Sequence, residues 1–105
     1  MRNSKVRRVT IYINEADKWR GRPLHLEILR FLEQEGCAGG TVLRGVAGFT
    51  RAAGVVTTSL VDAGGKLPLV IDYIDTPEAV ARVLPHLREM AGNRLITMTD
   101  LEVFP

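Results

Sequence analysis

The segment spanning residues 21–49 constrains the fold more than any other part of the chain. Pro23 stands where a helix begins, because its missing N–H costs nothing in the first turn, and Gly36 is placed to end that helix with a positive φ. Apolar side chains recur on one helical face, at Leu24, Ile28, Phe31 and Leu32. The pattern predicts a helix over about residues 22–36 and a strand over about residues 41–49.

The remaining elements are predicted from alternation and from helix caps. Residues 9–13 alternate apolar and polar side chains, and residues 67–74 and 94–104 are predicted as further strands. Thr76-Pro77-Glu78 supplies an N-cap hydroxyl, a first-turn proline and an acid for a second helix that ends at Gly92. The order β-α-β-β-α-β predicts an α+β, ferredoxin-like sandwich, in which a four-stranded antiparallel sheet carries two helices on one face.

The composition is typical of one globular domain over residues 1–105, with 46% hydrophobic residues available for a core. Fourteen basic and twelve acidic residues leave a net charge of +2, so no nucleic-acid footprint is predicted. No apolar run reaches the ~18 residues of a membrane helix. Membrane insertion is therefore not expected, and the protein is expected to be cytoplasmic. Cys37 is the single cysteine, which excludes an intramolecular disulfide.

Two glycines interrupt the second predicted strand, where side chains would be preferred. Gly45 and Gly48 predict a bulge or a close backbone approach. The residues that follow, about 50–66, are rich in small side chains and are predicted to form a long mobile loop. Loops of that length in compact domains are usually functional or disordered. A loop of this kind is expected to respond to a ligand and to present a surface to a protein partner.

Several strands are predicted to be apolar on both faces. Tyr12, Val70, Ile74 and Val103 fall at positions that the two helices do not cover in this topology. An exposed apolar patch of that size marks an interface. Self-association is the expected way to cover it.

The predicted topology brings three connections to one edge of the sheet, at about residues 14–21, 48–51 and 92–94. Backbone N–H groups near Gly45 and Gly48, with arginines beside them, are expected to hold a phosphate or carboxylate there. The charged candidates for this ligand site are Arg51, then Arg44 and Arg94, with Glu15 and Asp17 either orienting the arginines or carrying a counter-cation. The alternative is that the two carboxylates form ordinary surface salt bridges, with Arg20 or Arg51.

The chain offers no catalytic constellation. It lacks H-E-x-x-H and a Walker motif, and nothing in it nominates a Ser-His-Asp or Cys-His pair. His25 and His86 lie on the predicted helices without a metal-spaced partner. A non-enzyme is predicted, and neither a cofactor nor a metal is named by the sequence. Trp19 is expected to pack at the edge of the first helix, with stacking on a ligand base as the alternative.

Three stretches together carry a family resemblance: NEADKWRG, RPLHLEILRFLEQEGCAGGTVLRGVAGF and KLPLVIDYIDT. They resemble a small bacterial and archaeal family that is similar to the PII nitrogen-signalling proteins, over about residues 8–104. The resemblance implies a homotrimer with its sheets facing inward, a nucleotide in the clefts between subunits, and signalling through the long loop. It places Gly45, Gly48, Phe49 and Arg51 at the strand end and loop stem that serve the ligand. The lysine-bearing phosphate loop of PII proteins is reduced here to Gly92-Asn93-Arg94.

Two other functions are compatible with the same fold. One is a metal- or ion-handling trimer that resembles the copper-tolerance proteins and uses Glu15 and Asp17. The other is a purely structural adaptor without a small ligand. Dependence of binding on the two carboxylates would indicate the first, and the absence of any small-ligand effect would indicate the second.

Overall fold

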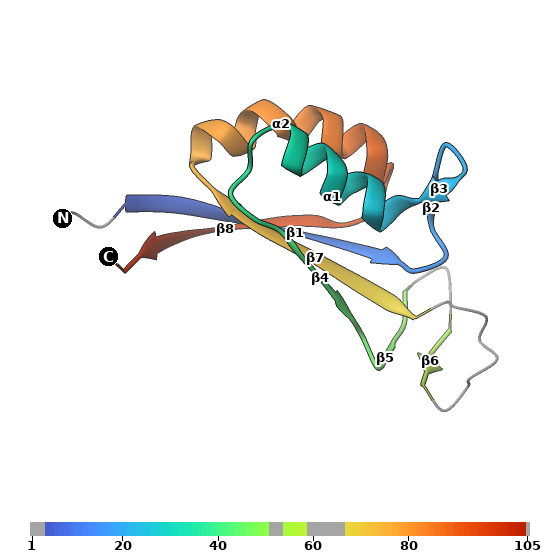
Figure 1. Cartoon of the computed structure of the whole chain (residues 1–105). Helices are drawn as coiled ribbons and strands as arrows, with labels where there is room; N and C mark the ends of the chain where they lie inside the picture. Colours follow the sequence, from blue (N-terminus) through green and yellow to red (C-terminus); the bar gives the residue numbers. More distant parts are fainter. Residues whose placement is uncertain (1–3, 51–53, 59–66, 105) are drawn as a thin grey trace.

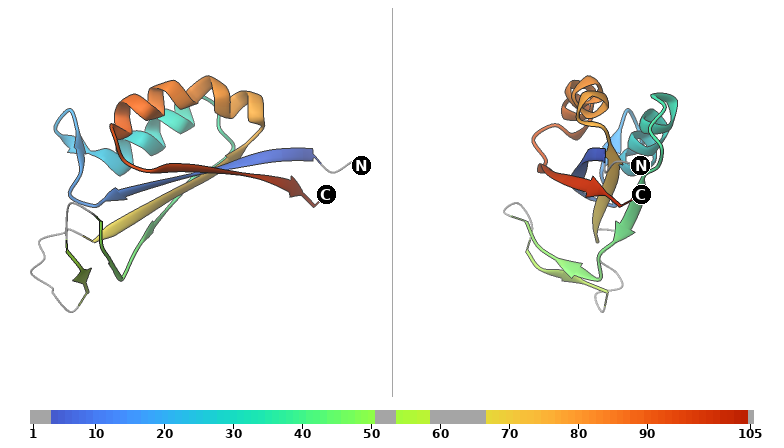
Figure 2. Two further views of the ribbon diagram at one scale, coloured as in Figure 1. Left: turned by 180° about the vertical axis from the view of Figure 1, so that it is seen from behind. Right: turned by 90° about the vertical axis from the view of Figure 1, so that its left-hand side faces the viewer.

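The structure, a computed structural model, describes residues 4–50, 54–58 and 67–104. Four antiparallel strands form the main sheet in the order β4-β7-β1-β8 (Figure 1). Their bounds are β1 Ser4–Asn14, β4 Thr41–Arg44, β7 Pro68–Asp75 and β8 Ile96–Val103. The two helices, α1 and α2, lie together on one face of this sheet (Figure 2). The predicted α+β, ferredoxin-like arrangement is confirmed.

Both helices end as their sequences predict. The α1 helix covers Leu24–Gln34, and Gly36 beyond it has a φ of 82°. The α2 helix covers Pro77–Ala91; the Thr76 hydroxyl accepts a hydrogen bond from the Ala79 N–H at 3.2 Å, and Gly92 has a φ of 63°. These local signals fix the helix ends before any tertiary contact is considered.

The core fills the space between the helices and the sheet. Side chains at alternate positions of β1 and β7 point into it, and each helix presents one apolar stripe to it. The most completely buried of these side chains are Val9, Ile11, Leu24, Ile28, Ile71, Val80, Val83 and Leu87. Their removal from water is the main stabilising term of the fold.

The first helix begins two residues later than predicted, because the chain before it forms a hairpin. Strand β2 (Lys18–Trp19) pairs with strand β3 (Arg22–Pro23) in antiparallel register. Arg20 and Gly21 form the turn between them. Pro23 is therefore the last strand residue before α1 and not part of its first turn.

The predicted strand over residues 41–49 is wrong in its second half, since β4 ends at Arg44. Gly45 still donates its N–H to the Pro68 carbonyl at 2.7 Å. Pro68 has no N–H to give in return, so the ladder between β4 and β7 ends at this point. The chain then enters a separate pair of strands, β5 (Ala47–Gly48) and β6 (Val56–Thr57).

The predicted mobile loop, about residues 50–66, falls mainly on 51–53 and 59–66, which lie outside the described residues. Its described middle part contributes β6, whose Val56 lies opposite Gly48. Among the described residues, no helix is both long and apolar enough to cross a bilayer.

The sheet face away from the helices carries exposed apolar side chains, as predicted. Tyr12, Val70 and Leu43 lie opposite one another across β1, β7 and β4, in one row on this face. Tyr12 is 43% exposed and Leu43 is 58% exposed. Ile74 and Val103 are also exposed. These strands are therefore apolar on both sides, although the helices cover only one.

Candidate functional site

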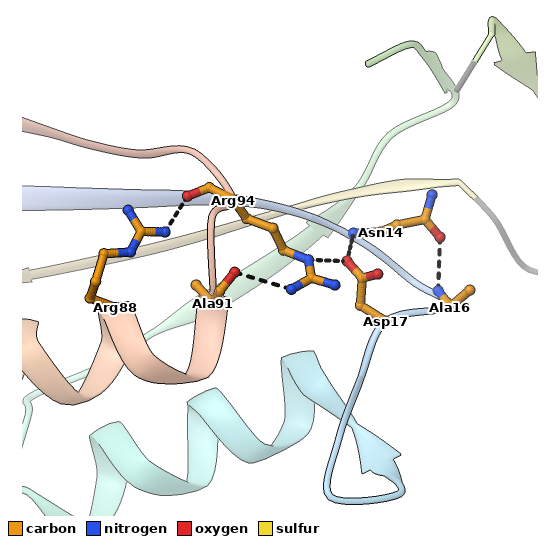
Figure 3. Close-up of polar contacts among 6 residues, drawn as sticks. All are labelled: Asn14, Ala16, Asp17, Arg88, Ala91 and Arg94. Carbon is orange, nitrogen blue, oxygen red and sulfur yellow. Dashed lines mark hydrogen bonds and ion pairs between the residues drawn. The ribbon is translucent and has the colours of Figure 1, made fainter. Parts of the chain in front are cut away.

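The end of β1 and the start of β8 meet at an ion pair between Asp17 and Arg94 (Figure 3). Asp17 Oδ2 lies 2.8 Å from Arg94 Nε, and the same oxygen accepts the Asn14 N–H at 2.8 Å. Arg94 also donates through Nη1 to the Ala91 carbonyl at 3.0 Å. The Arg94 carbonyl in turn accepts a hydrogen bond from Arg88. The guanidinium is therefore held from both sides at the end of α2.

A second ion pair joins Glu15 to Arg44. Arg44 Nε and Nη2 donate to the two carboxylate oxygens at 2.8 and 3.1 Å, a bidentate contact. Glu15 Oε1 also accepts the Leu67 N–H at 3.0 Å, and the Glu15 N–H donates to the Leu67 carbonyl at the same distance. Arg44, with 60% of its side chain exposed, presents its remaining donors to solvent.

Each carboxylate is thus ion-paired with one arginine, Glu15 with Arg44 and Asp17 with Arg94. They do not pair with Arg20 among the described residues. Arg51 lies outside the described residues. Two arginines at one end of the sheet, each fixed by a carboxylate, suit recognition of a phosphate or carboxylate.

The two glycines serve a contact within the chain. A Cβ on Gly45 would stand 2.8 Å from Pro68 Cγ, and one on Gly48 would stand 2.9 Å from the same atom. The predicted close approach is present, and Pro68 is the residue approached. The Gly45 N–H is already donated to Pro68, which corrects the expectation that it is open to an anion. The contact of Pro68 with these glycines was not predicted from the sequence, although a proline at the start of a strand is a recognisable signal.

Exposed apolar residues flank the two short strands β5 and β6. Phe49 is 76% exposed, Val46 72% and Val55 65%. Side chains of this kind in solvent favour contact with another chain or with the apolar part of a ligand.

The Glu15–Arg44 pair predicts a pH dependence of stability. The Arg44 hydrogen bonds, and then the Leu67 N–H, hold the pKa of Glu15 below its ordinary value of 4.5. A carboxylate whose pKa is lowered by folding stabilises the native state above pH 4.5, and that contribution is lost as the pH falls through the lowered value. In urea unfolding at one protein concentration, Glu15→Gln should therefore lose stability at pH 7, and the loss should be smaller at pH 3, below the ordinary value. Glu33→Gln, at an exposed helix position, is the control, and an equal loss at both pH values in Glu15→Gln would contradict the assignment.

The chain matches a known protein family over nearly its whole length. Residues 6–103 match the DUF190 family, described as "Uncharacterized ACR, COG1993". The chain belongs to this family. A UPF0166 protein of Methanocaldococcus jannaschii is 35% identical over 101 residues, covering 95% of this chain and 93% of the relative. A UPF0166 protein of Aquifex aeolicus is 30% identical over 103 residues, covering 98% and 97%.

Among solved structures, the fold is similar to that of CPII, a nitrogen regulatory PII-like protein from Thiomonas intermedia K12 bound to ADP, AMP and bicarbonate. The TM-score is 0.71 at 16% identity, over 97% of this chain and 91% of CPII. At that identity the likeness establishes the fold. The resemblance to PII-like proteins that the sequence motifs indicate is confirmed at this level.

Proposed function

We propose that this DUF190 chain is a PII-like signalling protein and not an enzyme. In this proposal it assembles as a homotrimer, binds a small anionic, nucleotide-like ligand in the clefts between subunits, and presents residues 50–66 to a protein partner. CPII, which shares the fold, was solved with ADP, AMP and bicarbonate. These ligands are anions, and they define the chemical class to test first.

The observation that carries the proposal is a charged edge beside an exposed apolar sheet face. Arg44 is 60% exposed in its side chain and lies on β4, next to the row formed by Leu43, Val70 and Tyr12. A second subunit that covers this row would bring its own surface up to the edge that holds Arg44 and Arg94. A cleft built in this way would be lined by oriented guanidinium groups, which bind phosphate bidentately.

The metal-handling alternative has less support from the same geometry. Glu15 and Asp17 each engage a different arginine. Within the described residues, no three His, Cys, Asp or Glu side chains gather in a group able to hold a metal ion. A divalent cation at either carboxylate would have to displace a guanidinium that already neutralises it.

A thermal-shift panel tests the proposal directly. ADP, AMP, ATP, bicarbonate and divalent cations are added singly to the full chain, and a ligand that binds the native state raises its unfolding midpoint. We expect a nucleotide to give the largest shift. Calorimetry on Arg44→Ala should then give binding that is weaker by about 1.5–3 kcal/mol, the range for a hydrogen bond to a charged group.

The matched control is Arg30→Ala, which removes an exposed guanidinium from α1 with its i,i+3 ion pair to Glu27. It should bind as the wild type does. Arg51→Ala is measured in parallel, because the resemblance also places that residue at the loop stem. Unchanged affinity in both Arg44→Ala and Arg51→Ala would move the anion site away from this edge. Cation binding that is lost in Glu15→Gln, with no nucleotide effect, would favour the metal-handling alternative.

A further inference from the structure

The β2–β3 hairpin carries three cations close together. Lys18, Arg20 and Arg22 lie within five residues and have no acid among them. The whole chain carries a net charge of +2, so the rest of it carries −1. Within the part of the chain that the structure describes, none of these three cations forms an ion pair. The hairpin is therefore a compact positive surface whose cations have no ion-pair partner among the described residues.

The tip of the hairpin breaks a local backbone preference. Arg20 has a φ of 52° and Gly21 a φ of 81°, and Trp19 lies opposite Arg22 across a two-residue turn. Two positive φ values indicate a type I′ turn, whose first position favours Asn, Asp or Gly. Arginine there carries a steric cost that asparagine or glycine would largely avoid. Residues that break a local rule in this way are concentrated at functional sites.

Trp19 holds the Arg20 side chain in place. The Arg20 guanidinium carbon lies 5.0 Å from the centre of the Trp19 ring, a cation–π contact. The indole is half-buried and packs against the main core. Because residues opposite each other in a hairpin share a face, Arg22 lies on the same face as Trp19. The result is one guanidinium over an anchored ring, with a second arginine opposite that tryptophan in the hairpin.

The hairpin also lies at the functional end of the molecule. The β2–β3 and β5–β6 hairpins leave the same end of the main sheet, as Figures 1 and 2 show. Asp17, immediately before β2, forms the ion pair with Arg94, so the hairpin base is continuous with the charged edge.

From these observations we infer that the β2–β3 hairpin is a docking surface for an acidic segment of a partner protein, with Arg20 and Arg22 pairing with its carboxylates. This inference rests on the proposed function as a signalling protein. A nucleic acid fits the hairpin less well, because bases need an aromatic face on which to stack. In this hairpin the Arg20 guanidinium lies over the Trp19 ring, and Trp19 itself packs against the core.

The hairpin contains its own spectroscopic probe, since Trp19 is the single tryptophan of the chain. A hexaglutamate peptide is titrated into the full-length protein and followed by tryptophan fluorescence, with calorimetry giving the affinity. We expect a saturable change in emission and binding that weakens as salt is added. A six-nucleotide thymidine oligomer is the comparison anion and is expected to bind no more tightly than the peptide.

Two variants separate docking from folding. Arg20→Gly removes the guanidinium and relieves the positive φ, so its thermal midpoint should equal or exceed that of the wild type. Its affinity for hexaglutamate should fall about tenfold, as should that of Arg22→Gln, since each loses a charge-assisted contact. Arg30→Gln, with the same charge change on α1, should bind the peptide as the wild type does.

Each other result has a defined meaning. Equal weakening in Arg30→Gln would reduce the effect to net charge and overturn the inference, as would tighter binding of the oligonucleotide. A lower midpoint in Arg20→Gly with unchanged peptide affinity would make Arg20 a structural residue only. Arg44→Ala should leave hexaglutamate binding intact, so failure of the hairpin inference is distinguishable from failure of the proposed ligand site.

Discussion

Sedimentation of the intact protein at micromolar concentration is expected to give one species of about 35 kDa, three copies of the 11.6 kDa chain. The sheet face away from the helices supplies the reason. Tyr12, Val70 and Leu43 form an apolar row there, and Ile74 and Val103 add to it. Burying that surface between subunits removes it from water at roughly 25 cal/mol per Å², and monomeric proteins rarely leave such a patch exposed.

A single charge at the centre of this row should prevent assembly. Val70 lies between Tyr12 and Leu43 on β7, so Val70→Glu would place a carboxylate where another subunit is expected to pack. Burying an unpaired charge costs several kcal/mol, enough to shift the equilibrium to a species of about 11.6 kDa. Circular dichroism should still report both helices, because the core lies on the other face of the sheet.

Leu26→Glu is the matched control for Val70→Glu. Leu26 is also partly exposed, but it lies on α1, on the opposite side of the sheet. It should sediment as the wild type does. A wild-type monomer would remove the clefts between subunits, and the proposed ligand site with them. A fully assembled Val70→Glu variant would place the interface on another surface.

The helices of this fold were predictable because their signals are local. The Thr76 hydroxyl, the first-turn Pro77 and the positive φ values of Gly36 and Gly92 act within one turn of the chain. The alternation around Ile11 likewise assigns β1 to a half-buried strand. Such signals need no knowledge of which distant residue is a neighbour, and they define the element order that identifies the sandwich.

The pairing at the candidate site was not predictable for the opposite reason. Glu15 meets Arg44 across 29 positions, and Asp17 meets Arg94 across 77. The predicted topology places these four residues at one edge. Several arginines could pair with each carboxylate there, and strand register and side-chain rotamers determine which of them does. The β2–β3 hairpin was also missed, because arginine at the first turn position hides the usual Asn-Gly signal.

The close contact between Gly45 and Pro68 predicts that a side chain at position 45 will lower the stability of the fold. A Cβ on Gly45 would stand 2.8 Å from Pro68 Cγ and 3.3 Å from the Pro68 carbonyl oxygen, so the backbone or the ring must shift. Gly45→Ala should destabilise the protein by about 1–3 kcal/mol, the usual cost of overpacking. Urea unfolding at one protein concentration measures it, since assembly would make the midpoint concentration-dependent.

Removing the ring should recover part of that loss. In Gly45→Ala/Pro68→Ala the Cγ atom is gone, and the double-mutant cycle should show a coupling of about 0.5–3 kcal/mol between the two positions. Gly39→Ala is the matched control, because a Cβ at Gly39 has nothing within 4 Å. It should be neutral or slightly stabilising, since alanine restricts the unfolded chain more than glycine does. If Gly45→Ala were as neutral as Gly39→Ala, the glycine would not be needed for the approach of Pro68, and its place at the end of β4 would require another explanation.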